Sequence, residues 1–142
     1  MINDFMTEIC SVLNINKPSV SYDTSHFTTN TMMAQCDPSG DTIYLKKKDK
    51  PDPDYLFSIA HELRHVWQLV SDKDLYFSNY KPIDMLDIEI YNNQLAEIDA
   101  NAFASLIMID FFHLQPLYHG LSASTIANIK TRMKIISCEL TE

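Results

Sequence analysis

The stretch AHELRHVWQ, residues 60–68, constrains the fold of this chain more than any other part of its sequence. On a helix, at about 100° per residue, the apolar side chains in and around it gather on one face. They are Leu56, Ile59, Leu63, Val66, Trp67 and Val70. His61 and His65 fall on the opposite face, so they are predicted to look onto solvent or a cleft. The pattern therefore predicts an amphipathic helix over residues 53–70 with both histidines on its polar side.

Glu62 decides between two interpretations of that polar side. Two histidines four residues apart could simply belong to a solvated face. With a glutamate directly after the first, the pattern becomes H-E-x-x-H. On a helix this motif brings two imidazoles to one ion and a carboxylate beside the water that the ion binds. It favours zinc, and a catalytic zinc site needs a third protein ligand because the fourth position is kept for water.

A second long helix, predicted over residues 90–113, offers a candidate for that ligand. Glu97 falls within its apolar stripe, which comprises Ala100, Ala104, Ile107, Met108 and Phe111. An unpaired carboxylate buried there would be costly, and binding to a cation would remove that cost. The alternative is a salt bridge to a residue such as Arg64. Asn101, one turn further on, could accept the free N–H of a liganding histidine, whereas Asp99 points away and is a weaker ligand candidate.

The remaining segments predict an α+β chain. A helix is expected over residues 3–14, followed by a small antiparallel sheet with a β-hairpin. Residues 28–47 predict the two strands of this hairpin, joined by the turn DPSG. In that turn Pro38 presets φ and Gly40 tolerates a left-handed conformation.

The predicted helices have recognisable ends. Asp52 is the expected N-cap of the histidine-bearing helix, with Pro53 at its first position. Residues 71–85 show no clean period and contain a proline, so they are predicted to form a long connection, a kind of segment that is often functional. A C-terminal helix is capped by Ser122 or Ser124.

Length, charge and cysteine content narrow the classes of protein. The 142 residues fit one domain, over residues 1–142. The net charge of -8, from 11 basic and 19 acidic residues, disfavours nucleic acid as a partner. The basic run LKKKDK is expected to be a solvated strand end. Three widely spaced cysteines without a C-x-x-C pair are typical of reduced thiols in a cytoplasmic protein.

Neither a signal peptide nor a membrane span is expected. The segment MINDFMTEIC has acidic residues where a signal peptide would have basic ones. The longest apolar run, FASLIMIDFF, is far shorter than the roughly 20 residues of a spanning helix and is interrupted by Asp110. A soluble protein with no membrane partner is the expectation.

With HELRH on one helix and EIDANAFA on a later one, the chain resembles the gluzincin clan of zinc metallopeptidases. That clan pairs H-E-x-x-H with a downstream E-x-x-x-D or E-x-x-A-D/N. Among its small members the chain is most similar to the ImmA/IrrE-like peptidases, whose second motif, E-x-E-A-N-x-F-A, corresponds to residues 97–104. The specific resemblance covers about residues 55–108, and the order of elements matches the minimal clan architecture.

The resemblance implies a role for each matching residue. His61, His65 and Glu97 would be the zinc ligands, Glu62 the general base, and Asn101 a hydrogen-bond partner behind a ligand. These peptidases often have glycine where this chain has Arg64. That arginine could reach the rim of a cleft and contact substrate, or form a surface salt bridge.

The expected function is zinc-dependent hydrolysis of peptide bonds in an intracellular protein or peptide, by Glu62-assisted attack of a zinc-bound water. One zinc ion per chain is expected. A donor to the oxyanion or a substrate contact is sought among Tyr76, Tyr80, Tyr91, His113, His119 and Arg64. One hairpin strand, such as residues 28–35, would offer an open edge to an extended peptide.

Two other functions stay open. The first is a catalytically inactive binding or regulatory module stabilised by zinc, although such a site needs no base at Glu62. The second, drawn from the resemblance alone, is a regulatory protease that cleaves a repressor. A DNA-associated protease of the SprT type is disfavoured, because it uses a histidine as the third ligand and carries a basic surface.

Overall fold

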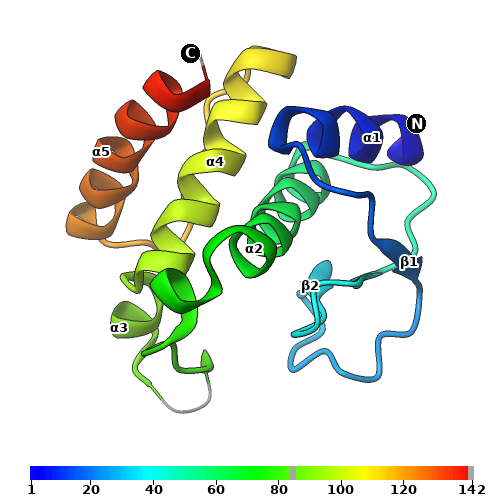
Figure 1. The fold of residues 1–142 in the computed structure, drawn as a ribbon, viewed down its shortest axis with the longest axis horizontal. Coiled ribbons are helices and arrows are strands. Elements are labelled where there is room, and N and C mark those ends of the chain that lie inside the picture. The colour runs from blue at the N-terminus through cyan, green and yellow to red at the C-terminus, as the bar shows by residue number, and fades with distance from the viewer. Residues whose placement is uncertain (84–85, 141–142) are drawn as a thin grey trace. The chain divides into compact units, whose positions relative to one another are not determined.

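The structure, a computed structural model, describes residues 1–83 and 86–140. It has an N-terminal helix, a small three-stranded sheet and then helices, so the α+β prediction is confirmed (Figure 1). The chain divides into two compact units, residues 1–71 and 72–142. The single domain expected from the length stays a prediction. No helix among the described residues is long and apolar enough to cross a membrane.

The first unit begins with α1, Ile2–Leu13, close to the predicted residues 3–14. Its apolar residues recur at helical spacing and are buried on one face. They are Phe5, Met6, Ile9, Cys10 and Leu13. The helix ends at Asn14, which adopts the left-handed conformation (φ 54°) and is followed after a short interval by Pro18.

The sheet is mixed, whereas the sequence predicted an antiparallel one. The strands are β1 (Ser19–Ser21), β2 (Ala34–Cys36) and β3 (Thr42–Leu45), in the spatial order β1-β3-β2. The hairpin of β2 and β3 is antiparallel, as predicted. β1 lies parallel to β3 because residues 22–33 carry the chain past β3 before the hairpin begins. With only three residues, β1 has no period that sequence could reveal.

The hairpin turn has the predicted chemistry. The N–H of Gly40 donates to the carbonyl of Asp37 at 2.9 Å. Gly40 has a φ of 78°, a left-handed conformation in which glycine has no steric cost. The backbone N–H of Ser39 donates to the Asp37 carboxylate at 3.0 Å, which holds the turn closed.

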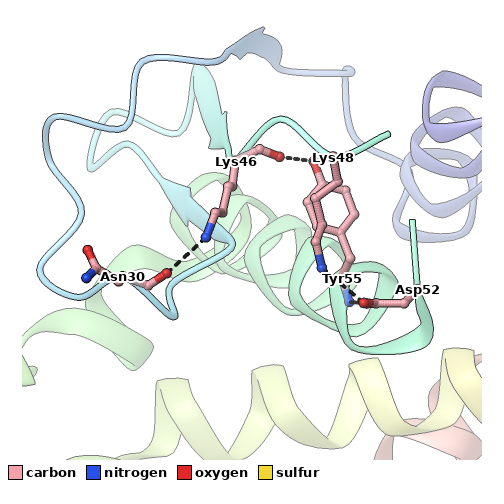
Figure 2. A network of polar contacts seen from close by, with 5 residues as sticks. All are labelled: Asn30, Lys46, Lys48, Asp52 and Tyr55. Atoms are coloured by element: carbon pink, nitrogen blue, oxygen red, sulfur yellow. Dashed lines mark hydrogen bonds and ion pairs between the residues drawn. The ribbon is translucent and has the colours of Figure 1, made fainter. Parts of the chain in front are cut away.

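One face of α2, Pro53–Phe77, carries the hairpin. Residues seven apart on a helix return to nearly the same direction, and three of them contact the hairpin in succession. The hydroxyl of Tyr55 donates to the carbonyl of Lys46 at 2.6 Å (Figure 2). The carboxylate of Glu62 accepts the backbone N–H of Cys36 at 2.8 Å. Leu69 borders the hairpin turn. The hairpin is therefore fixed along α2 on both sides of the histidine motif.

Asp52 caps α2, as predicted (Figure 2). Its Oδ1 accepts the N–H of Tyr55 at 2.9 Å, and its Oδ2 pairs with the ammonium of Lys48 at 3.0 Å. These contacts lower the pKa of the Asp52 carboxyl, the Tyr55 N–H first. Lys46, at the end of β3, donates to the carbonyl of Asn30 at 3.0 Å (Figure 2). The basic run is thus a solvated strand end, as expected.

α2 extends further than the predicted residues 53–70, but it is interrupted. Asp72 has non-helical torsion angles (φ -155°, ψ 72°), and the boundary between the two units falls there. The predicted connection over residues 71–85 is therefore helical as far as Phe77; residues 84 and 85 lie outside the described part. Val70, which was predicted to face the core, is 62% exposed; it lies at the end of the first helical segment, two residues before the break at Asp72.

The second unit is built on α4, Leu95–Phe112, and α5, Ala123–Leu140, which lie side by side (Figure 1). A single helix was predicted over residues 90–113, but α3, Ile88–Asn92, is separate from α4. Gln94 has an extended backbone (ψ 146°) and divides the two helices. The N-cap of α5 is Ser122, one of the two predicted residues, whose hydroxyl accepts the N–H of Thr125 at 3.1 Å.

A buried ion pair connects α4 and α5. The Nε–H of Arg132 donates to the carboxylate of Asp99 at 2.9 Å, and its Nη2 donates to the hydroxyl of Tyr76 at 3.0 Å. The side chain of Asp99 is completely buried. Asp99, the weaker ligand candidate, therefore neutralises Arg132, and α4 is buried on more than the one apolar stripe that the sequence predicted.

Candidate metal centre

The two motif histidines converge on α2. His61 is half-buried and His65 is buried, so neither lies on the open solvated face that was the alternative interpretation. Their Nε2 atoms are 3.1 Å apart, and their rings meet edge to face at 86°. Two nitrogens bound tetrahedrally to one zinc at roughly 2.0–2.1 Å would be about 3.3 Å apart. The observed separation is close to that value.

Gln68 fixes the tautomer of His65. The amide of Gln68 is fully buried, and its Oε1 lies 2.8 Å from Nδ1 of His65. An amide oxygen can only accept, so Nδ1 carries the proton and Nε2 presents a lone pair. That lone pair points at Nε2 of His61. The pair therefore fits a divalent cation that prefers imidazole nitrogen, such as zinc.

The sequence did not single out Gln68. Metal-ligating histidines commonly donate their second N–H to an acceptor, and the prediction assigned that role to Asn101. On α2 the residue three positions after His65 lies on the same face, which is the signal that could have found Gln68. The backbone carbonyl of Asn101 accepts the hydroxyl of Ser105 at 2.7 Å. The role of the Asn101 side chain stays a prediction.

Glu62 faces the outer edge of the sheet. In the β2–β3 hairpin, Met33 and Asp37 exchange hydrogen bonds with β3, so the polar backbone groups of Cys36 point away from it. The N–H of Cys36 donates to Oε2 of Glu62 at 2.8 Å. Because the described sheet ends at β2, this strand is an edge beside Glu62. The sequence had left open which strand forms the edge and suggested residues 28–35.

Arg64 is buried rather than exposed. It is 2% exposed, and its guanidinium carbon lies 3.7 Å from the centre of the Trp67 ring. A surface salt bridge, the alternative weighed from the sequence, is therefore wrong for this arginine. Stacking on an indole uses the planar guanidinium in a way that glycine, the residue often found here in similar peptidases, could not.

In the second unit, Glu97 is held by a tyrosine. Glu97 lies in the first turn of α4 and is 4% exposed. The hydroxyl of Tyr80 donates to Oε2 of Glu97 at 3.0 Å and lies 3.0 Å from the hydroxyl of Tyr91. Burial first, and the negative charge of Glu97 second, raise the pKa of Tyr80 far above its ordinary value. Tyr80 is thus a neutral phenol that hydrogen-bonds a buried carboxylate.

The second unit also contains three other candidates for an oxyanion donor, Tyr76, His113 and His119. His113 follows the last turn of α4, about 24 Å along the helix from Glu97 at 1.5 Å per residue. It is exposed, as is His119. Tyr76 is buried, and its hydroxyl accepts a hydrogen bond from Arg132. Of the six candidates, Tyr80 and Tyr91 are the two whose hydroxyls form a chain to Glu97.

These features define the class of the protein. A helix with H-E-x-x-H, on which the Nε2 atoms of His61 and His65 face each other, is metallopeptidase-like. The chain matches the model of the IrrE N-terminal-like domain, peptidase family M78, over residues 10–135, and it belongs to that family. The family is a zinc-associated peptidase family, which agrees with the resemblance noted in the sequence. No curated protein and no solved structure matches the chain.

Proposed function

We propose that this protein is a zinc-dependent metallopeptidase that hydrolyses peptide bonds of an intracellular protein or peptide. The observation that carries the proposal is the histidine pair, in which Gln68 leaves the lone pair of His65 directed at Nε2 of His61. Membership of a peptidase family supports the same assignment.

The proposed ligands are His61, His65 and Glu97. Glu97 is supported by its place in the second motif and by the neutral donor that Tyr80 supplies to its carboxylate. Zinc, when bound, lowers the pKa of its water and polarises a substrate carbonyl. Glu62 would accept the proton of the attacking water and pass it to the leaving amine.

The hydrogen bond between Cys36 and Glu62 supports a docking site for the substrate. An extended peptide can add to an exposed edge strand through its main chain. β2 offers the outward backbone groups of Ala34 and the carbonyl of Cys36, beside the proposed base, to which the Cys36 N–H already donates. We propose that the substrate lies along β2, with its scissile bond near Glu62.

The test is a comparison of the zinc-loaded wild type with Glu62→Gln, which keeps the size of the side chain and removes its basicity. Both proteins are incubated with a proteome-derived peptide mixture, and new termini are identified by mass spectrometry. The expected result is new termini with the wild type and their loss, by 100-fold or more, with Glu62→Gln. Zinc binding without new termini in the wild type would favour the inactive, zinc-stabilised module instead.

The regulatory protease that cleaves a repressor is a narrower form of the same proposal. It is supported by the family, not by a recognisable repressor-binding feature of this chain. The same peptide experiment addresses it, because the identities of the cleaved proteins would include a transcriptional repressor.

A further inference from the structure

The segment that follows α2 brings a tyrosine hydroxyl to the carboxylate of Glu97. The sequence predicted a long connection over residues 71–85, a kind of segment that is often functional. Tyr80 lies three residues after the end of α2, and its hydroxyl is 3.0 Å from Oε2 of Glu97. The contact is made entirely within the second unit.

A pair of hydrogen bonds fixes the position of Tyr80. The side-chain amide of Gln94 accepts the backbone N–H of Lys81 at 2.7 Å and donates to the carbonyl of the same residue at 2.9 Å. Gln94 is also the N-cap residue of α4, three residues before Glu97. The ring of Phe77 meets that of Tyr80 edge to face, with centroids 5.1 Å apart. The backbone next to Tyr80 is therefore fastened to the start of the helix that carries Glu97.

The direction of the hydrogen bonds follows from counting protons. An ionised carboxylate can only accept, so the single phenolic proton of Tyr80 is donated to Glu97. Tyr91, 3.0 Å away, must then donate its own proton to the oxygen of Tyr80. The chain of donors runs from Tyr91 to Tyr80 to Glu97, and it adds no positive charge that would repel a metal cation.

We propose that Tyr80 is a positioning residue for the zinc ligand Glu97: it occupies Oε2, fixes the rotation of the carboxylate and so favours coordination through one oxygen. This inference rests on the proposed function, because it takes Glu97 to be a ligand. Partners behind a ligand typically account for 10–100-fold in metal affinity. Tyr91 supports Tyr80 and acts one hydrogen bond further from the metal.

The test measures zinc affinity by competition with a chromophoric chelator, and the visible absorption spectrum of the Co²⁺-substituted protein. Tyr80→Phe removes one hydroxyl and keeps the ring. We expect it to bind zinc about 10–100-fold more weakly than the wild type and to change the Co²⁺ spectrum. Tyr91→Phe should weaken binding less. The Co²⁺ spectrum reports the geometry of the ligands directly. A loss of packing that left the ligands in place would not change it.

Tyr118→Phe is the matched control. It removes another half-buried hydroxyl of the second unit, one that donates to Ser105 at 2.8 Å and not to Glu97. We expect wild-type affinity and spectrum. If Tyr80→Phe lost helical structure, Gln94→Ala would test the role of Tyr80 instead. It removes the hydrogen bonds to Lys81 that hold the segment next to Tyr80, and it keeps every side chain that contacts Glu97. That variant should also bind zinc several-fold more weakly.

Two different results would overturn the inference, and they can be told apart. A wild type that binds zinc while Tyr80→Phe binds it equally well, with an unchanged Co²⁺ spectrum, would overturn the role of Tyr80 alone. A wild type that binds no zinc would overturn the proposed function and this inference with it.

Discussion

Loss of the buried ion pair between α4 and α5 should strongly destabilise the second unit. Arg132→Met removes the guanidinium that donates to Asp99 at 2.9 Å and to Tyr76 at 3.0 Å. Removing one partner of a buried pair costs about 3–5 kcal/mol. The side chain of Arg132 is 20% exposed, so in the variant water can partly take the place of the guanidinium beside Asp99. The low end of the range of about 3–5 kcal/mol therefore applies. With about 1 kcal/mol for the hydrogen bond to Tyr76, the expected loss in the free energy of unfolding is about 3–4 kcal/mol.

The assay is urea unfolding followed by circular dichroism, with a chelator present so that metal does not contribute. Lys134→Met, an exposed lysine on the same helix, is the matched control and should change stability by no more than about 0.5 kcal/mol. An Arg132→Met variant within 1 kcal/mol of the wild type would refute this reasoning.

The contribution of this ion pair to stability should not change with pH near neutrality. Burial alone lowers the pKa of Arg132, but the hydrogen bond and charge of Asp99 raise it above its ordinary value. Because the pKa of Arg132 is raised in the folded state, its contribution to the free energy of unfolding is fully present below the pKa of the unfolded state. That contribution is lost only as the pH rises through the pKa of the folded state. The cost of Arg132→Met should therefore be constant between about pH 6 and pH 9, since the guanidinium stays charged there.

Two further predictions concern the first unit. Gln68→Leu should weaken zinc binding about 10–100-fold, because the Nδ1 proton of His65 loses its acceptor; unchanged affinity in chelator competition would contradict the role of Gln68. The pKa of Asp52 is lowered by the N–H of Tyr55 and by Lys48. The contribution of ionised Asp52 to the free energy of unfolding is therefore present above the pKa of the unfolded state, and it is lost as the pH falls through the pKa of the folded state. Asp52→Asn should remove this part of the acid dependence of the urea midpoint; an identical acid limb in both proteins would count against it.

The sequence predicted the long helices well where apolar periodicity and capping residues agreed. α1, the start of α2 and the Asp37–Gly40 turn follow from local chemistry alone. It missed β1, whose three residues are defined only by pairing with β3. It also merged α3 with α4, because the break depends on the side chain of Gln94 binding the distant backbone of Lys81.

For the candidate site, the sequence identified the motif residues and missed those that orient them. The spacing of His61 and His65 predicted their convergence, since both lie on one helix face. The partner of Glu97 was not predictable from spacing, because Tyr80 reaches it from a segment seventeen positions earlier. Arg64 was misjudged for a similar reason: helix periodicity gives a direction but not the ring of Trp67, on which the guanidinium stacks.

The central claim is that one zinc ion is bound per chain, with Glu97 as a ligand and Glu62 as a base that does not bind the metal. The most direct test compares zinc content and affinity in the wild type, Glu97→Gln and Glu62→Gln, which carry the same chemical change at two positions. We expect one zinc per chain in the wild type and in Glu62→Gln, and a loss of affinity of 100-fold or more in Glu97→Gln. A wild type without zinc, or a Glu97→Gln variant that binds it as tightly as the wild type, would contradict the claim.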